Sequence, residues 1–573
     1  MTDLNRCKVA TIGVLLGLCT QAAQAQLDPA AIGRQNEVRE RQQQELLRAD
    51  QDRALRAAPV RPGADLKDLQ PKVTVPDIGV KCRNINVVRI DNAAHLPDAV
   101  REQVEREFAG RCLGVAELES VLAQITKSYI ERGFITTRAY LPAQDLRSGT
   151  LVVAVIEGTI EAFKVDGPRA NAIWPRGVFP ATPGDLLNLR DLEQGIEQAN
   201  RLASNRAVLD IEPGTQPGQS VVTVRNPSAT PINLFTSADN YGTEATGKRN
   251  ASATVSLDSV LGLNELISVT RRESVPHDRD HNSVSNALQV SVPFGYSLLT
   301  LDASESRYAN RVALPSGSSI MSNGKTNTRS ATLDRVIYRG QATRLSLTGR
   351  LTTQDTESFL GGQPLGVASR KLAFADIGVS GFFSAVGGTG NARLAFVKGL
   401  SGFGALRDDA DLPDDAPHAQ FRKVTLDAGF SRAFEVATRP VILSTQISSQ
   451  YSYDTLYGSQ QFLVGGITSV RGSSLNTLSG DSGYLLRTEL SLPWQIGTNG
   501  VGVGGRVYLG YDFGAVTNRA PGVPSGSMSG VALGTTVAWK GASLDVFVAR
   551  ARHLPSFMTR ESNQFGLRLS YSL

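Results

Sequence analysis

The chain has 573 residues, of which 41% are apolar and 55 are glycine, and its net charge at pH 7 is only +5. Such a length is expected to cover several domains, and the glycine content favours many thin strands over one large core. The small net charge comes without a cluster of aromatic and basic residues, which argues against nucleic-acid binding.

The first 25 residues are typical of a secretory signal peptide. Arg6 and Lys8 precede a short apolar run, and Ala23-Gln24-Ala25 offers a small-residue cleavage site. The run is about ten residues long, whereas a membrane-spanning helix needs about twenty. We therefore predict that residues 1–25 are removed and that the mature protein leaves the cytoplasm.

Two cysteines remain in the mature chain. Cys7 and Cys19 lie in the signal peptide, which leaves Cys82 and Cys112 as an even pair in an oxidising compartment. Such a pair predicts a disulfide, and its loop of about 30 residues would constrain the unfolded chain by about 3 to 4 kcal/mol. Two thiols without nearby histidines do not complete a tetrahedral metal site, so we expect no metal.

Residues 26–57 contain a predicted helix that is polar on every side. Between Gln35 and Arg56 strong helix formers are combined with charged and amide side chains, with almost no apolar stripe. Such a helix is solvated, frayed, or enclosed by another polar surface such as a water-filled lumen, and the segment alone favours the solvated state. Residues 58–76 follow as a proline-rich linker, which we expect to be extended and mobile.

Two small α+β units follow the linker. The first, residues 77–158, is predicted to contain a strand at 85–90, helices at 98–108 and 115–132, and strands at 136–141 and 151–157. The second, residues 159–227, is predicted to contain a strand at 160–165, a helix at 189–202, and strands at 207–212 and 220–225. Two consecutive units of one kind indicate a repeat, and neither supplies a catalytic constellation or a phosphate-binding glycine loop.

Residues 228–573 show strands and turns without helical periodicity. In the stretch 501–513, Val507, Leu509 and Tyr511 share one face, and Arg506 and Asp512 share the other. A soluble barrel would have to bury the charged face at several kcal/mol for each unpartnered group. An apolar outer band around a polar lumen is instead the signature of an outer-membrane barrel, and the length accommodates on the order of 16 strands.

One arginine within this region stands at a glycine-flanked turn. In the sequence QFLVGGITSVRG, Gly465, Gly466 and Gly472 allow tight or positive-φ backbone around Val470 and Arg471. A hairpin there can carry the guanidinium at its tip, where five donors need a carboxylate partner. An isolated VRG tripeptide would more often belong to a solvated surface loop.

The order of these parts resembles that of the two-partner secretion transporters, the TpsB family with its ShlB, FhaC and HecB members, which are related to the outer-membrane insertases. The motifs that carry the resemblance are 129–133, 141–144 and 157–158 in the first unit, 189–192 and 200–202 in the second, and 239–242 and 292–296 in the barrel. The resemblance implies a membrane β-barrel of about 16 antiparallel strands, preceded by two α+β POTRA domains and an N-terminal plug helix.

In that family the VRG hairpin folds back into the barrel, and its arginine pairs with an aspartate of the inner wall. The matching positions here are Val470, Arg471 and Gly472 at the tip and Asp512 on the wall. Ser473 departs from the family, because an aromatic residue often follows VRG, and this affects the packing of the tip. The C-terminal Leu573, where phenylalanine is usual, affects the assembly signal.

The resemblance also implies a function in polypeptide secretion. The POTRA domains would capture the N-terminal secretion domain of a large, unfolded exoprotein by strand addition, and the exoprotein would pass through the barrel. The polar helix would be a removable plug, with the polar side chains Gln35, Arg39, Arg41, Glu45 and Arg48. The protein would lie in lipids of the bacterial outer membrane, with its POTRA domains in the periplasm, as a monomer or weak dimer without a cofactor or enzymatic activity.

Other classes of protein account for fewer of these features. An outer-membrane assembly factor of the insertase kind would usually have more than two POTRA domains, and a passive porin accounts for the barrel alone. An outer-membrane enzyme is a distant alternative, because the five histidines show no ligand spacing and no nucleophile elbow. The exoprotein can be a haemolysin, an adhesin or a contact-dependent toxin.

Overall fold

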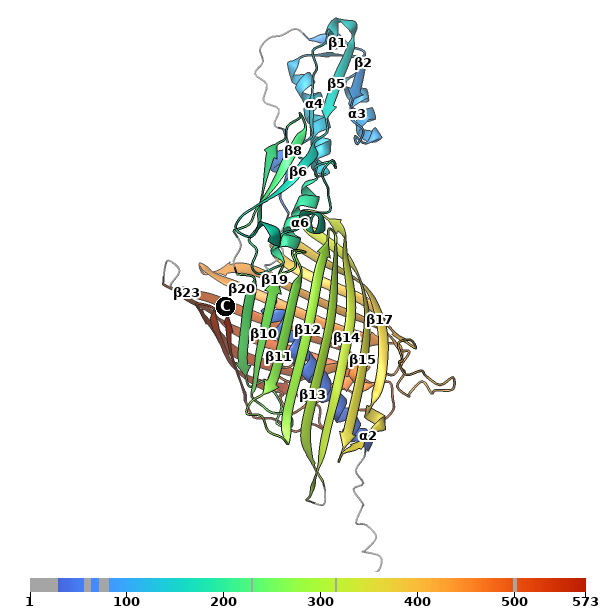
Figure 1. Ribbon diagram of the computed structural model, residues 1–573, viewed down its shortest axis with the longest axis vertical. Helices are drawn as coiled ribbons and strands as arrows, with labels where there is room; N and C mark the ends of the chain where they lie inside the picture. Colours follow the sequence, from blue (N-terminus) through green and yellow to red (C-terminus); the bar gives the residue numbers. More distant parts are fainter. Residues whose placement is uncertain (1–28, 56–62, 72–81, 228–229, 315–316, 498–501) are drawn as a thin grey trace, which may run out of the picture.

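Two small domains stand in series at one end of a closed β-barrel, and a long helix crosses the barrel lumen (Figure 1). This computed structural model describes residues 29–55, 63–71, 82–227, 230–314, 317–497 and 502–573. The predicted signal peptide, both ends of the predicted polar helix, most of the linker and Val501 lie outside the described residues. The described linker residues include a short 3-10 helix, η1 (Leu66–Leu69), where we predicted extended chain.

The first domain packs two helices against a mixed sheet. Its elements are β1 (Arg83–Ile85), β2 (Val87–Asp91), α3 (Asp98–Phe108), β3 (Arg111–Leu113), α4 (Val115–Glu131), β4 (Arg138–Tyr140), η2 (Leu146–Ser148) and β5 (Thr150–Ile156). The sheet order is β2-β5-β4, and β1 pairs separately with β3. The single strand predicted at 85–90 is divided into β1 and β2. The break is at Asn86, whose N–H donates to the carbonyl of Gly149.

The second domain repeats this sheet plan. Its elements are β6 (Thr159–Asp166), η3 (Ala170–Ala172), α5 (Pro175–Val178), α6 (Leu189–Asn200), β7 (Val208–Pro213) and β8 (Gln219–Arg225). In each three-stranded sheet the first strand, β2 or β6, runs parallel to the last strand, β5 or β8, which lies in the centre of the sheet. The N–H of Leu189 donates to the carbonyl of Gly133, so helix α6 begins directly against the first domain.

Sixteen antiparallel strands close the barrel within the part of the chain that the structure describes, as predicted. They are β9 (Ile232–Asp239), β10 (Asn250–Asp258), β11 (Leu266–Ser274), β12 (His281–Phe294), β13 (Ser297–Ala313), β14 (Ser319–Arg339), β15 (Thr343–Leu360), β17 (Arg370–Ala385), β18 (Gly388–Leu400), β19 (Arg422–Val436), β20 (Arg439–Ser452), β23 (Ser482–Ile496), β24 (Val503–Thr517), β25 (Gly526–Trp539), β26 (Ala542–His553) and β27 (Gln564–Ser572). The two-residue β16 (Gln363–Pro364) and the 3-10 helix η4 (Gly366–Ala368) lie in the connection after β15. Pairing of β27 with β9 closes the ring.

The alternation predicted for β24 is confirmed. Leu509 and Tyr511 are 57% and 47% exposed on the outer surface, whereas Tyr508 and Asp512 are buried inside. An apolar exterior and a polar interior suit a wall with lipid on one side and water on the other. Among the described helices, none combines the length and the apolar run that a membrane-spanning helix requires.

Helix α6 fixes the second domain to the barrel rim (Figure 1). The amides of Gln194 and Gln198 donate to the carbonyl of Gly295 in the turn between β12 and β13, at 3.2 and 3.4 Å. Glu197 pairs with Arg339 and Arg344 beside the next turn. These contacts hold the second domain at the mouth of the lumen.

Cys82 and Cys112 form the predicted disulfide, with their Cα atoms 5.3 Å apart. The bond ties the start of β1 to β3. Replacing both residues, Cys82→Ser with Cys112→Ser, should lower the free energy of unfolding of the first domain by about 3 to 4 kcal/mol, because the unfolded chain gains loop entropy. Pulse proteolysis in urea measures this loss. The readout is cleavage of the first domain from the barrel, which stays folded.

Reduction of the unaltered protein provides the matched control. Dithiothreitol should move its urea midpoint to that of the double variant and should leave the variant's own midpoint unchanged. Equal midpoints for the oxidised protein and the variant would contradict a stabilising role of the disulfide.

Candidate functional site in the barrel lumen

The VRG motif lies at the tip of a hairpin inside the barrel. The connection from β20 to β23 contains a 3-10 helix, η5 (Gly458–Gln460), and the paired strands β21 (Phe462–Gly465) and β22 (Thr477–Gly480). Val470 is fully buried at the tip, where it packs with Val464 and with Met528 of the wall. The hairpin is therefore packed against the inner wall rather than solvated.

Arg471 is held by two carboxylates of the wall. Its Nε and Nη2 donate to the two oxygens of Asp512 on β24, both at 2.7 Å, and its backbone N–H donates to Oδ2 at 3.0 Å. Its Nη1 donates to Oε1 of Glu489 on β23 at 2.6 Å. The bidentate geometry uses the planar fork of the guanidinium, which a lysine does not offer.

Two glycines make this approach possible. Gly472 has φ +95°, and a Cβ there would lie 2.8 Å from the Cα of Arg550 on β26. A Cβ at Gly510 would lie 2.8 Å from the guanidinium carbon of Arg471. Any larger residue at Gly472 would push the tip off the wall, and one at Gly510 would push the guanidinium away from its partners.

The Arg471–Asp512 pair is enclosed. Arg471 is 2% exposed and Asp512 is fully buried, so both charges are out of contact with bulk water. Removing one partner of such a pair leaves an uncompensated buried charge, which costs about 3 to 5 kcal/mol. Arg487 adds a hydrogen bond from Nη1 to the carbonyl of Thr468 at 2.6 Å, which ties the wall to the tip a second time.

Ser473 stands in a network of hydrogen bonds. Its hydroxyl donates to the carbonyl of Asn476 at 3.0 Å and to Glu561 at 3.2 Å, and Glu561 also accepts from the backbone N–H groups of Ser474 and Leu475. Burial alone would raise the pKa of Glu561, but these donors outweigh it and the pKa lies below its ordinary value. Polar contacts therefore hold the residues that follow the tip arginine.

Asp481 is a structural residue that the sequence patterns do not single out. Its two oxygens accept from the N–H groups of Leu456 at 2.9 Å and Arg519 at 2.8 Å. It thereby joins the hairpin connection to the loop between β24 and β25. The only signal in the sequence is its place between Gly480 and Gly483, which does not reveal its partners.

Helix α2 (Pro29–Ala54) lies inside the lumen (Figure 1). Its 26 residues give a length of about 39 Å, which exceeds the hydrocarbon thickness of a bilayer, about 30 Å. Asn36 and Asp50 are fully buried although both are polar. The solvated state that the segment alone favoured is therefore wrong, and the enclosed alternative is correct.

The far end of α2 is fixed to the wall by polar contacts. At this end, away from the two small domains, Glu37 pairs with Arg370, and the amide of Asn36 donates to the hydroxyl of Ser322 at 3.0 Å. Among the described residues, this end of the helix has one small apolar cluster. It joins Ile32 to the connection after β15.

The middle of α2 contacts the hairpin and its connection. The amide of Gln42 donates to the hydroxyl of Thr477 on β22 at 2.9 Å, and Arg41 donates to the carbonyl of Ser459 at 3.0 Å. The helix and the hairpin therefore touch directly.

A buried ionic network joins α2 to the closure of the barrel. Asp50 accepts from Arg272 of β11 at 2.7 Å, and Arg272 also donates to Asp239 of β9 at 2.8 Å. Asp239 in turn accepts from Arg568 of β27 at 2.9 Å. One chain of alternating charges thus spans the helix and both strands that close the ring.

The helix residues named from the sequence play smaller parts. Gln35 and Arg48 are exposed, and Arg39, Arg41 and Glu45 are half-buried. Glu37 and Asp50, which make the ionic contacts, were not singled out. Nothing in a helix polar on all sides marks those two in the sequence, because their partners lie more than 200 residues away.

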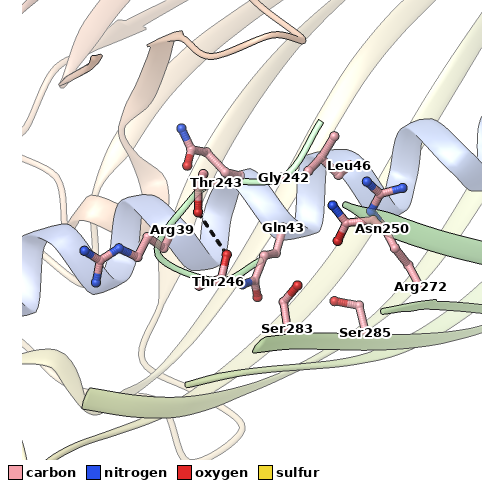
Figure 2. A pocket seen from close by; sticks show the side chains of 11 residues that line it. Arg39, Gln43, Leu46, Gly242, Thr243, Thr246, Asn250, Arg272, Ser283 and Ser285 are labelled. Atoms are coloured by element: carbon pink, nitrogen blue, oxygen red, sulfur yellow. Dashed lines mark hydrogen bonds between the residues drawn. The ribbon is translucent and has the colours of Figure 1, made fainter. Parts of the chain in front are cut away.

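The helix fits one side of the lumen tightly and leaves space on the others. Figure 2 shows Gln43 of α2 beside Ser283 and Ser285, with segment 242–246 against the helix, around a cavity of only about 20 Å³. A cavity of about 510 Å³ is lined by Arg48, and one of about 410 Å³ by Arg471 and Glu489. The helix therefore narrows the lumen without filling it.

A closed barrel with a polar lumen, an internal helix and two α+β domains at one end defines an outer-membrane transporter with POTRA domains in the periplasm. Residues 218–537 match the family of haemolysin secretion/activation proteins ShlB/FhaC/HecB, residues 84–158 match the ShlB-type POTRA domain, and residues 159–213 match a POTRA domain. The chain belongs to this family of two-partner secretion transporters.

Relatives match this chain over four fifths of its length or more. The outer membrane transporter CdiB of Dickeya dadantii is 29% identical over 570 residues, which cover 97% of each chain. The hemolysin transporter protein ShlB of Serratia marcescens is 30% identical over 463 residues, which cover 81% of each. The structure of CdiB from Escherichia coli superposes with a TM-score of 0.83 at 30% identity, covering 96% of this chain and 100% of that one.

The burial of Arg471 leads to a prediction about hairpin stability. Arg471→Ala should lower the free energy of opening of the hairpin by about 3 to 5 kcal/mol, because Asp512 is left buried and unpaired. Hydrogen–deuterium exchange of residues 462–480 in the reconstituted protein measures the opening.

Arg506→Ala is the matched control. Arg506 contacts the same Glu489 at 3.4 Å, but its side chain is 43% exposed, so its loss should change the opening by less than about 1 kcal/mol. Equal exchange in both variants would contradict the special role of the buried pair.

Proposed function

We propose that this transporter captures a large, unfolded exoprotein in the periplasm, releases α2 from the lumen, and passes the exoprotein to the cell surface. The observation that carries the proposal is a helix that lies in the lumen next to two POTRA domains and is held there mainly by hydrogen bonds and ion pairs. A passive porin does not need the POTRA domains, and an insertase would usually have more of them. The relatives are named as transporters, including one for a haemolysin.

Capture by the POTRA domains is supported by a free sheet edge. Strand β7 lies at the edge of its sheet, and its outer side pairs with no further strand among the described residues. Val208 and Ile211 of this strand are 56% and 37% exposed. An extended segment of the exoprotein adds to such an edge through backbone hydrogen bonds, which tolerate many sequences. The opposite edge is less open, because Asp185 pairs with Ile160 at the start of β6.

Release of α2 is supported by the chemistry of its contacts. The 26-residue helix buries three large apolar side chains, Ile32, Leu46 and Leu47, so leaving the lumen exposes much less apolar surface than unfolding a hydrophobic core would. Its charged groups exchange protein partners for water, and the amide of Gln43 has no hydrogen-bond partner among the described residues. A polar helix in a hydrated lumen is thus held specifically but is not anchored by a hydrophobic core.

The hairpin acts in this proposal as a fixed guide for the lumen. Arg471 and Asp512 hold its tip on the β23–β24 wall, while Thr477 contacts the helix. The tip stays in place when the helix leaves, because its strongest contacts are to the wall. The exoprotein then moves along a rigid, polar surface.

Deletion of residues 31–56 should raise the single-channel conductance of the purified protein in planar bilayers, because the two lumen cavities merge into one wider path. The variant Asp50→Asn, which removes the charge that pairs with Arg272, should give more frequent openings. Arg48→Gln is the control, since Arg48 faces a cavity and should leave the conductance near that of the unaltered protein. An unchanged conductance after the deletion would refute the plug.

Secretion of the exoprotein tests the hairpin. Arg471→Ala should reduce the exoprotein in the culture medium at least tenfold. Arg471→Lys should secrete an amount between those of Arg471→Ala and the unaltered protein, since lysine keeps the charge but lacks the planar guanidinium. The measurement is immunoblotting of the medium, normalised to folded barrel in the outer membrane, with Arg506→Ala as control. Normal secretion by Arg471→Ala would limit the tip to a structural role.

A further inference from the structure

The three tryptophans of the chain lie at the height of the barrel end that faces the periplasm, two on the strands β23 and β25 and one in the second POTRA domain. Trp539 ends β25 and is 51% exposed, and Trp494 lies near the end of β23, two residues after the outward-facing Leu492. Tryptophan at this height of an outer-membrane barrel marks the boundary between acyl chains and headgroups. The third, Trp174, comes from the second POTRA domain and is 38% exposed.

Trp174 is held at the rim of the barrel. Just before it, the carbonyl of Ala172 accepts from the hydroxyl of Ser259 at 2.6 Å, and Arg169 donates to the carbonyl of Asp258 at 3.3 Å. Just after it, the carbonyl of Gly177 accepts from the N–H of Gly295 at 2.7 Å. Segment 169–177 therefore lies against two neighbouring turns of the barrel.

The first of these turns, residues 259–265, exposes apolar side chains. Val260, Leu261 and Leu263 are 49%, 69% and 37% exposed. The turn is rigid, because Glu265 accepts from the N–H groups of Leu261 at 2.7 Å and Leu263 at 3.0 Å. The exposed leucines thus stand on a fixed turn, at positions where turns in water usually carry polar residues.

These side chains continue the lipid-facing band of the barrel. Val255 on β10 and Val269 on β11 are exposed on the outer surface at 42% and 53%. At about 3.3 Å per residue, Leu261 lies no more than about 10 Å beyond the end of β10. The exposed apolar residues of the turn therefore lie between those of the strands and segment 169–177, which contains Trp174.

We propose that Trp174, Val260, Leu261 and Leu263 form a lipid foot by which the second POTRA domain binds phospholipids of the inner leaflet. The apolar side chains enter the boundary of the acyl chains, and the exposed Arg176 beside them faces the phosphates. The membrane then fixes the second POTRA domain together with the barrel rim. Its edge strand β7 keeps one orientation toward the periplasm.

Quenching by brominated lipids tests the foot in the full-length protein. Three single-tryptophan proteins are made by Trp→Phe changes and reconstituted in phosphatidylcholine vesicles, with or without bromine on the acyl chains. Trp174 should be quenched to an extent comparable with Trp494 and Trp539, and its emission should lie to the blue of solvent-exposed tryptophan. Val87→Trp in a tryptophan-free background, on the first domain, should not be quenched.

Two variants of Leu261 test whether the turn itself lies in the lipid, independently of the Trp174 ring. Leu261→Trp in the tryptophan-free background should also be quenched, and Leu261→Asp should weaken quenching of Trp174. Quenching of Trp174 as low as that of Val87→Trp, in proteins whose barrels show normal heat-modifiable migration, would overturn the proposal. If Trp174 responds to the secretion domain of the exoprotein but not to bromine, the surface binds exoprotein and the lipid foot is wrong.

Discussion

Every backbone N–H and C=O that faces lipid has to find its partner on a neighbouring strand, and this requirement organises the whole molecule. It closes β9 onto β27, and the pleat of each strand then turns successive side chains to opposite faces of the wall. The apolar side chains must then point outward, so the charged ones line the lumen. A polar helix and a buried arginine fork become possible only inside such a wall.

Charged side chains position the elements inside the lumen, where they face other polar groups or water and not hydrocarbon. Asp239, Arg272 and Asp50 form one network that includes the internal helix, and Arg471 with Asp512 forms another that includes the hairpin. Both networks end on strands of the wall, so the two internal elements are positioned by the same barrel. They differ in their packing: the hairpin buries Val470 in an apolar cluster of the wall, whereas the helix is bound mainly by polar groups and buries Ile32, Leu46 and Leu47.

Local patterns predicted the parts of this structure that depend on local physics. Alternation turned Asp512 inward, since the side-chain period of a strand needs only neighbouring residues. Helix formers marked α3 and α4 to within a residue. Two other contacts had no such signal, because each joins distant segments through polar side chains. They are the pairing of Asp50 with Arg272 and the capping of residues 473–476 by Glu561. A polar helix also has the same composition whether water or a polar wall surrounds it, so its place in the lumen had to come from the fold.

Helix α2 runs from the end of the barrel opposite the POTRA domains back toward them (Figure 1). Since those domains lie in the periplasm, the first turn of the helix stands at the cell-surface end, next to the loops that follow β15. A chain delivered from the periplasm reaches this arrangement only by moving its own beginning outward across the membrane as the barrel forms. If α2 leaves the lumen during secretion, as proposed above, each return of the helix repeats that outward passage.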